Sequence, residues 1–353
     1  MSKQIKTYHE QAYIDNTLRL RDILNTMPAF AKDYFRAMEP TTSAKTRISY
    51  AYDIRVFFRF LIDNNPVYKN YTMNQFQIKD LELIEPVDIE EYQEYLKVYQ
   101  NDDKRITNKE RGLARKMSAL RSFFGYFFKR QIIAKNPTLL VDMPKLHDKA
   151  IIRLDTDEVA MLLDYVEQCG NKLTGQRKVY YEKNKFRDLA IMTLLLGTGI
   201  RVSECVGLDI QDVDFKNNGI KVTRKGGNEM VVYFGDEVRK AILDYLETSR
   251  KAVTPLPDHE NALFLSTQRR RIGVQAVENM VKKYSKEVTP NKKITPHKLR
   301  STYGTSLYKE TGDIYLVADV LGHKDVNTTK KHYAAIDEDR RRKAASAVKL
   351  REV

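Results

Sequence analysis

Apolar positions recur with a helical period through most of the N-terminal part of this chain. Residues 46–63 place apolar side chains on one stripe, which predicts an amphipathic helix. That stripe consists of Ile48, Tyr52, Val56 and Phe60. Further helices are predicted over 87–99, after Pro86, and over 107–131, and the first forty residues also have a helical pattern. We therefore expect this part to be nearly all helix.

The helical period stops in residues 142–153, DMPKLHDKAIIR, which contain a proline and several charges. A segment of this composition is typical of a linker between domains. A chain of 353 residues is comfortable for two domains. We predict a helical domain over 1–145 and a second domain over 146–353.

The second domain mixes helical and strand patterns. Residues 219–234 alternate on both sides of Lys-Gly-Gly-Asn, which predicts a β-hairpin, and a short strand is expected over 262–266. The predicted fold class is mostly α with a small β-sheet or hairpin. The expected helices are 155–168, 184–197, 236–250, 273–287, 296–310, 313–321 and about 327–335.

Composition adds a charge argument. The chain has 61 basic and 47 acidic residues, a formal charge of +14. Such an excess favours polyanionic partners, nucleic acid first, although a merely basic protein has the same balance. No apolar run approaches the ~20 residues of a membrane span, and the N-terminus has no signal-peptide pattern. We expect a cytoplasmic protein with Cys169 and Cys205 as buried, reduced thiols.

The segment ITPHKLR, residues 294–300, starts a helix with Thr295 as N-cap and Pro296 in the first turn. His297 and Arg300 then lie three residues apart on one face. Cations oppose the helix dipole at this end unless an anion is bound there, and a phosphate fits. The alternative is a surface helix with incidental basic residues.

The segment GTGIRVSE, residues 197–204, follows a strongly apolar helix that is expected to end at Gly197. Arg201 directly after such a helix is expected to be partly buried, and a buried guanidinium needs a partner. Glu204 can orient it, and arginine also binds phosphate in a bidentate manner. A purely structural Arg–Glu pair is the alternative.

Lys225 lies at the predicted hairpin tip, where two glycines follow it. A lysine that reaches into a groove from this position can donate a proton or supply a point charge. A lysine that only aids solubility is the alternative.

The segment LGHKDVNTTKKHY, residues 321–333, ends a helix at Gly322 and places His323 just beyond it. Tyr333 falls on the next predicted helix. A phenol with a pKa near ~10 is a poor nucleophile unless nearby cations favour the phenolate. The alternative is a tyrosine that only packs.

Taken in order, GTGIRVSE, TRKGG, TPHKLR and LGHKDVNTTKKHY resemble the signature of the tyrosine recombinases over residues 150–340. Within that family the chain looks most like the single-recombinase Xer type of Firmicutes, with mobile-element integrases and invertases as near neighbours. It departs from the Xer pattern because Tyr333 lies ten positions after His323 instead of nine. Position 301 is serine where many members have histidine.

The resemblance implies a mechanism that uses neither metal nor other cofactor. Tyr333 would attack a scissile phosphate, leave a 3′-phosphotyrosine and release a 5′ hydroxyl. Arg201 and Arg300 would bind the non-bridging oxygens. His297 would act as general base or hydrogen-bond donor, His323 would bind the same phosphate, and Lys225 would protonate the leaving oxygen.

The resemblance also implies a C-shaped, two-domain clamp on double-stranded DNA, with residues 1–145 as the DNA-binding domain and 146–353 as the catalytic domain. It further implies a specific target site and a homotetramer on two paired sites. A helix near 337–350 would dock on a neighbouring subunit, and a translocase or directionality factor can control activity. Basic side chains are expected to contact DNA phosphates. These are Lys45, Arg47, Arg111, Arg115, Lys116, Arg269, Arg270 and Lys298.

Two other functions stay open at this stage. A type IB topoisomerase shares the chemistry without site specificity, and a catalytically silent, sequence-specific DNA-binding regulator shares the fold. The complete set of six candidate residues argues against the regulator. A metal-dependent nuclease is disfavoured because the sequence has no carboxylate cluster suited to Mg²⁺.

Overall fold

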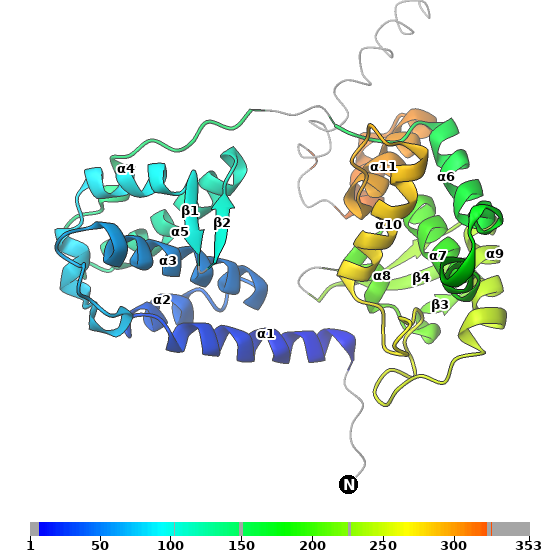
Figure 1. Ribbon diagram of the computed structural model, residues 1–353, viewed down its shortest axis with the longest axis horizontal. Coiled ribbons are helices and arrows are strands. Elements are labelled where there is room, and N and C mark those ends of the chain that lie inside the picture. The colour runs from blue at the N-terminus through cyan, green and yellow to red at the C-terminus, as the bar shows by residue number, and fades with distance from the viewer. Residues whose placement is uncertain (1–6, 102, 148–150, 225–226, 323–325, 327–353) are drawn as a thin grey trace, which may run out of the picture. The chain divides into compact units, whose positions relative to one another are not determined.

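The computed structural model describes residues 7–101, 103–147, 151–224, 227–322 and 326. Its contacts divide the chain into two compact units, residues 1–149 and 150–353, and the boundary falls inside the predicted linker 142–153. Both are mainly helical with a small antiparallel sheet (Figure 1), and the mostly helical fold class is as the sequence predicts.

The described residues of the first unit form five α-helices and one two-stranded sheet. Helix α3 begins after Ser43, whose hydroxyl accepts from the Thr46 amide, as expected of an N-cap. The helices are α1 (Tyr8–Asn25), α2 (Ala31–Ala37), α3 (Ala44–Asn64), α4 (Pro86–Tyr95) and α5 (Glu110–Lys129).

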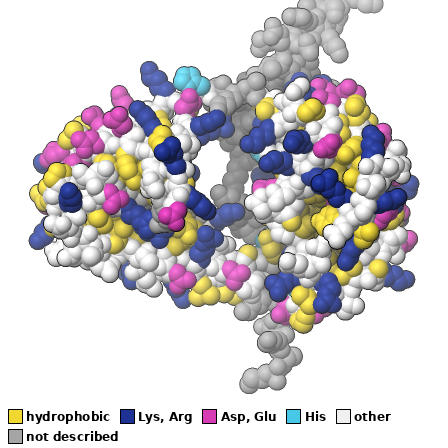
Figure 2. Space-filling view, viewed as in Figure 1, with side chains coloured by type: hydrophobic (Ala, Val, Ile, Leu, Met, Phe, Trp, Pro, Cys, Tyr) yellow, Lys and Arg dark blue, Asp and Glu magenta, His cyan; other side chains and the backbone are white. Residues whose placement is uncertain are grey.

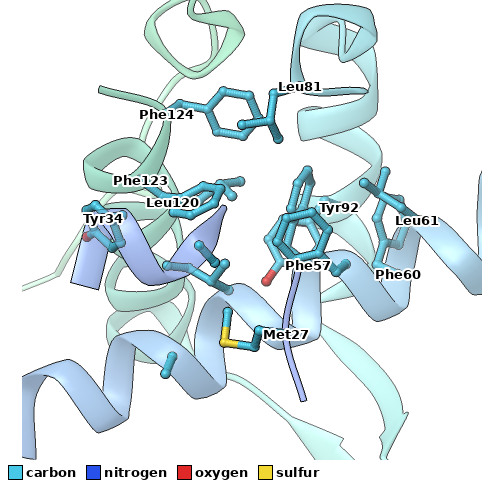
Figure 3. Close-up of a cluster of buried hydrophobic side chains, with 14 of the residues drawn as sticks. Met27, Tyr34, Phe57, Phe60, Leu61, Leu81, Tyr92, Leu120, Phe123 and Phe124 are labelled. Atoms are coloured by element: carbon cyan, nitrogen blue, oxygen red, sulfur yellow. The ribbon is translucent and has the colours of Figure 1, made fainter. Parts of the chain in front are cut away.

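An aromatic cluster holds the first unit together (Figure 3). The Phe57 ring meets Tyr92 of α4 at 5.0 Å between centroids, and Tyr34 of α2 meets Phe123 of α5 at 5.2 Å. Both pairs are edge-to-face, the arrangement that aromatic quadrupoles favour. The apolar half of α5 therefore packs inward, as its sequence pattern predicts.

The prediction that the N-terminal part is nearly all helix was wrong for residues 98–107. Strand β1 (Val98–Asn101) pairs antiparallel with β2 (Lys104–Thr107), and Val98 lies opposite Thr107. The helix predicted over 87–99 therefore ends at Tyr95, and the one predicted over 107–131 begins at Glu110. Arg59 of α3 donates to Asn101 at 2.7 Å and ties the hairpin to the unit.

The second unit packs helices around α7 (Gly175–Thr198), whose apolar half is almost completely buried. Helices α9 and α11 both contact α7. The sheet has the order β3-β4-β5, and Gly219–Thr223 pairs with Glu229–Tyr233 as predicted. The other helices are α6 (Thr156–Gln168), α8 (Val202–Gly207), α9 (Asp236–Tyr245), α10 (Val274–Val288), α11 (Pro296–Thr311) and α12 (Ile314–Leu321). The strands are β3 (Val213–Asp214), β4 (Gly219–Thr223) and β5 (Glu229–Tyr233).

Two local predictions in this unit need correction. Residues 262–266 form no strand and make only isolated bridges from Ala262 and Leu265. Helix α7 runs one residue past Gly197, to Thr198. The helix expected near 327–335 and the docking helix near 337–350 lie outside the described residues. Cys169 and Cys205 are both buried and free, as predicted.

Candidate active site

Gly199 ends α7 in the left-handed conformation, with φ of 62°. A Cβ at this position would stand 2.4 Å from the Tyr303 ring and 3.0 Å from Leu321 of α12. Only glycine satisfies both the backbone conformation and this close approach. The GTG turn therefore packs directly against α11 and α12, and it brings Arg201 beside them.

Arg201 is the N-cap residue of α8, and Glu204 orients it as predicted. The buried Glu204 carboxylate accepts from the Arg201 backbone N–H at 2.8 Å and from the guanidinium at 2.7 Å. About a third of the Arg201 side chain stays exposed, at 35%, while that of Glu204 is 3% exposed. The guanidinium is thus held in a fixed orientation but remains accessible to a bound anion.

Arg300 lies in the first turns of α11, which begins after Thr295 with Pro296, as predicted. Its guanidinium is buried and donates to the Gly199 carbonyl and to the Leu321 carbonyl. Thr295 makes no side-chain capping bond. Arg300 therefore joins the turn after α7 to the end of α12, two segments far apart in sequence.

Three guanidinium groups meet at the C-terminus of α12. Arg201 donates to the Gly322 carbonyl at 3.2 Å, Arg300 to that of Leu321, and Arg224 to that of Val320 at 2.6 Å. The last carbonyls of a helix have no partner within it and form the negative end of its dipole. The cluster of Arg201, Arg224 and Arg300, the arginine cluster, is thus arranged by backbone oxygens into a site that suits an oxyanion.

Arg224 is the site residue that the sequence analysis missed. It follows strand β4, and burial lowers the pKa of its guanidinium, with Glu204 raising and Arg201 further lowering it. In the segment TRKGG, Arg224 directly precedes the predicted catalytic Lys225. The contact with α12 spans 96 residues of sequence, so no local pattern indicates it.

Of the other predicted catalytic residues, His297 is exposed at the start of α11. Lys225, His323 and Tyr333 lie outside the described residues. The structure therefore brings together the two predicted arginines, Arg201 of GTGIRVSE and Arg300 of TPHKLR. Arg224 of TRKGG contacts the same helix end, and Leu321 and Gly322 of LGH supply the carbonyls that Arg300 and Arg201 bind.

Of the residues predicted to contact DNA in the first unit, some are exposed and others are buried in ion pairs. Lys45 and Arg111 are exposed, and the Arg115 side chain is 48% exposed. Arg47 is buried and pairs with Glu39 at 3.1 Å, and the buried Lys116 pairs with Asp53 at 2.9 Å. The structure gives Arg47 and Lys116 ion-pair partners inside the unit, a role that their sequence positions do not indicate.

Asp53 is the common ion-pair partner of two basic side chains in the first unit. Its carboxylate, only 1% exposed, accepts from Lys116 and also from Arg115. A groove of 270 Å³ beside it lies between α3, the β1–β2 hairpin and α5. Its basic lining consists of Arg55, Arg59, Arg115 and Lys116.

Arg269 and Arg270 are exposed on the loop before α10, and Lys298 is half-buried on α11. Arg269 adopts φ of 61°, a left-handed conformation that is uncommon for arginine, and it borders a 620 Å³ cavity beside α7. This cavity contains none of the predicted catalytic residues.

Neither metal-ligand clusters nor membrane helices occur in the part of the chain that the structure describes. No group of three or more His, Cys, Asp or Glu side chains there could hold a metal ion. No described helix combines the length and apolarity needed to span a bilayer.

A cluster of three guanidinium groups in a basic, mostly helical chain is the kind of site that suits the phosphate groups of nucleic acid. The model of the phage integrase family matches residues 153–340, which contain the whole arginine cluster. The chain belongs to this family, and it is a tyrosine recombinase.

Two relatives match almost the whole chain. Tyrosine recombinase XerC of Caldanaerobacter subterraneus is 34% identical over 320 residues, which cover 89% of this chain and 84% of that protein. Tyrosine recombinase XerS of Streptococcus thermophilus is 30% identical over 351 residues, which cover 92% and 96%.

Two solved structures share the fold. XerH site-specific recombinase bound to palindromic difH substrate has a TM-score of 0.64 and 19% identity, with 86% of this chain and 80% of that chain covered. The Tn1549 transposon integrase bound to transposon right end DNA has a TM-score of 0.63 and 18% identity, with 90% and 99% covered.

Proposed function

We propose that this tyrosine recombinase cleaves and rejoins duplex DNA at specific sites through a 3′-phosphotyrosine intermediate, with Tyr333 as the nucleophile. The observation that carries the proposal is the arginine cluster, which gathers guanidinium groups from three chain segments at one helix end. A site of this kind suits the non-bridging oxygens of a phosphodiester in its transition state.

The chemical roles follow from the residue types. Arg201 and Arg300 bind the non-bridging oxygens, and His297 and His323 assist at the same phosphate. The Tyr333 oxygen forms a bond to phosphorus while the bond to the 5′ oxygen breaks, and Lys225 donates the proton to that oxygen. Religation reverses these steps and needs no ATP, because the phosphotyrosine conserves the energy of the diester.

DNA would be bound by both units, with residues 1–145 as the core-binding domain and 146–353 as the catalytic domain. The exposed Lys45, Arg111 and Arg115 support a phosphate-binding face on the first unit. Arg269, Arg270 and Lys298 extend this role to the second. Figure 2 shows Lys and Arg side chains on the visible face of both units, and affinity should therefore fall with salt.

Assembly and cellular role extend the proposal. Two copies would bind each site and two sites would pair in a homotetramer, with the helix near 337–350 docked on a neighbour. The relatives include Xer recombinases and a transposon integrase. Dimer resolution, integration, excision and inversion share this one reaction. We also propose that the protein acts in the cytoplasm and that a translocase or directionality factor controls its activity.

The test is an adduct trap. Wild type and Tyr333→Phe are incubated with fragmented DNA of the source genome, with and without EDTA, then denatured and run on a gel. A covalent protein–DNA species that forms only with wild type, and forms equally in EDTA, supports the proposal, and sequencing the trapped DNA names the site. Relaxation of a plasmid that lacks this site would instead favour topoisomerase activity. DNA binding without any adduct would favour the regulator.

A further inference from the structure

Arg224 contacts the end of α12 across 96 residues of sequence. Its guanidinium donates to the Val320 carbonyl at 2.6 Å and to the Asp319 carbonyl at 3.4 Å. These oxygens belong to the last turn of α12, where the carbonyls run short of intrahelical donors. The Asp319 carbonyl also accepts from the Gly322 N–H at 2.8 Å, so the stronger contact of Arg224 is the one with Val320.

Gly322, which follows α12, leaves room for this contact. Gly322 adopts φ of 61°, and a Cβ there would stand 1.3 Å from an Arg224 guanidinium nitrogen. Any other residue at position 322 would displace Arg224 from α12. The Arg224 guanidinium thus occupies the space that a Cβ at position 322 would need, and only glycine leaves that space free.

The backbone of Arg224 is held in the β4–β5 hairpin by two hydrogen bonds. Its N–H donates to the Asn228 carbonyl at 2.8 Å, and its carbonyl accepts from the Gly227 N–H at 3.0 Å. These bonds close the hairpin just beyond the Thr223–Glu229 pair of β4 and β5. Arg224 therefore connects the base of the hairpin tip rigidly to the C-terminus of α12.

We propose that Arg224 is a positioning residue that holds the base of the hairpin against α12 and thereby supports the general acid, Lys225, which is the next residue in the chain. This inference rests on the proposed function, in which Lys225 protonates the leaving 5′ oxygen. In this role Arg224 holds the segment before Lys225, while Arg201 and Arg300 bind the phosphate oxygens. Its loss should weaken general acid catalysis far more than DNA binding.

A change of leaving group tests this role. Cleavage is followed on a synthetic duplex of the trapped site, with either a normal 5′ oxygen or a 5′-bridging sulfur at the scissile phosphate. A thiolate leaves without a proton, so a defect confined to the general acid disappears with sulfur. The variants are Arg224→Met, Arg224→Lys, Lys225→Ala and Tyr333→Phe. Lys221→Ala, an exposed lysine of β4, is the matched control.

We expect Arg224→Met to cleave the oxygen substrate about 10²-fold more slowly than wild type, within the range of general acid catalysis. It should cleave the sulfur substrate within about threefold of wild type, as should Lys225→Ala. Arg224→Lys keeps the charge but cannot span both carbonyls, so its defect should be smaller. If Arg224→Met does not fold, Arg224→Lys provides the same comparison.

A defect of Arg224 variants that is equal on both substrates would overturn the inference, since it would mean direct phosphate contact or a general structural role. Wild-type rates on both substrates would overturn it too. In either case sulfur rescue of Lys225→Ala, with no cleavage by Tyr333→Phe, would leave the proposed function standing. Failure of wild type to cleave either substrate would overturn both.

Discussion

Glu204 accepts two hydrogen bonds from Arg201, one from its backbone N–H and one from its guanidinium. Replacement of Glu204 by glutamine keeps the shape but removes the charge that holds the guanidinium. We expect Glu204→Gln to slow cleavage about 10-fold to 100-fold, somewhat less than the ~10²–10³ typical when an oxyanion donor is removed. The unfolding free energy should fall by about 1–3 kcal/mol, because a buried charged partner is lost.

Single-turnover cleavage and urea denaturation measure these two effects. Glu237→Gln, an exposed acidic residue of α9, is the control and should change neither. Wild-type cleavage by Glu204→Gln would show that Arg201 needs no such partner.

Gly199→Ala should destabilise the second unit. The left-handed conformation costs a residue with a Cβ about 1–2 kcal/mol, and the clash with Tyr303 and Leu321 adds about 1–3 kcal/mol. Gly235→Ala is the matched control, because its φ is −84° and no atom lies within 4 Å of a Cβ there. The two variants are compared by thermal and urea unfolding. Equal stability of the pair would refute this view of the turn.

Asp53→Asn should leave two cations without their carboxylate, one of them the buried Lys116. Removal of one partner of a buried ion pair typically costs about 3–5 kcal/mol. In Asp53→Asn/Lys116→Met the uncompensated buried charge is gone, so the double variant should recover part of this loss. Urea denaturation of wild type, both single variants and the double variant gives the coupling energy. A coupling near zero would contradict the burial of this pair.

Cys205 should resist alkylation in the native protein. Burial raises the pKa of its thiol from 9.0 to about 12, and burial also raises that of Cys169. The neutral thiol stabilises the fold below pH 9, and this contribution is lost as the pH rises toward 12. Iodoacetamide should modify Cys205 at pH 9 only when guanidinium chloride is added, as read by mass spectrometry. Rapid native modification would show that the thiol is accessible.

The sequence predicted the elements whose pattern is local. The apolar stripe of α3, the alternation around Lys-Gly-Gly-Asn and the Thr-Pro start of α11 each depend on neighbouring residues, and each was correct within a few positions. The prediction failed at residues 98–107 because Val98 and Tyr99 extend the helical pattern of α4. The sequence between β1 and β2 also has no glycine to mark a hairpin turn.

The site was predictable in its residue types but not in its contacts. Arg201 and Glu204 are three residues apart, so their pairing could be anticipated. Lys116 is separated from Asp53 by 63 residues and Arg224 from Val320 by 96, so these contacts depend on the tertiary fold. A basic side chain in a sequence does not reveal whether its partner is a DNA phosphate or a buried carboxylate.

The identity of the nucleophile is the central claim. Wild-type protein trapped on DNA of its target site is digested with nuclease and trypsin, and the peptides are sequenced by tandem mass spectrometry. Cleavage after Lys331 and Arg340 gives the peptide 332–340, HYAAIDEDR, which contains Tyr333 as its only tyrosine. We predict that the nucleotide mass lies on Tyr333 of this peptide. A nucleotide on any other residue, His332 included, would contradict the assignment.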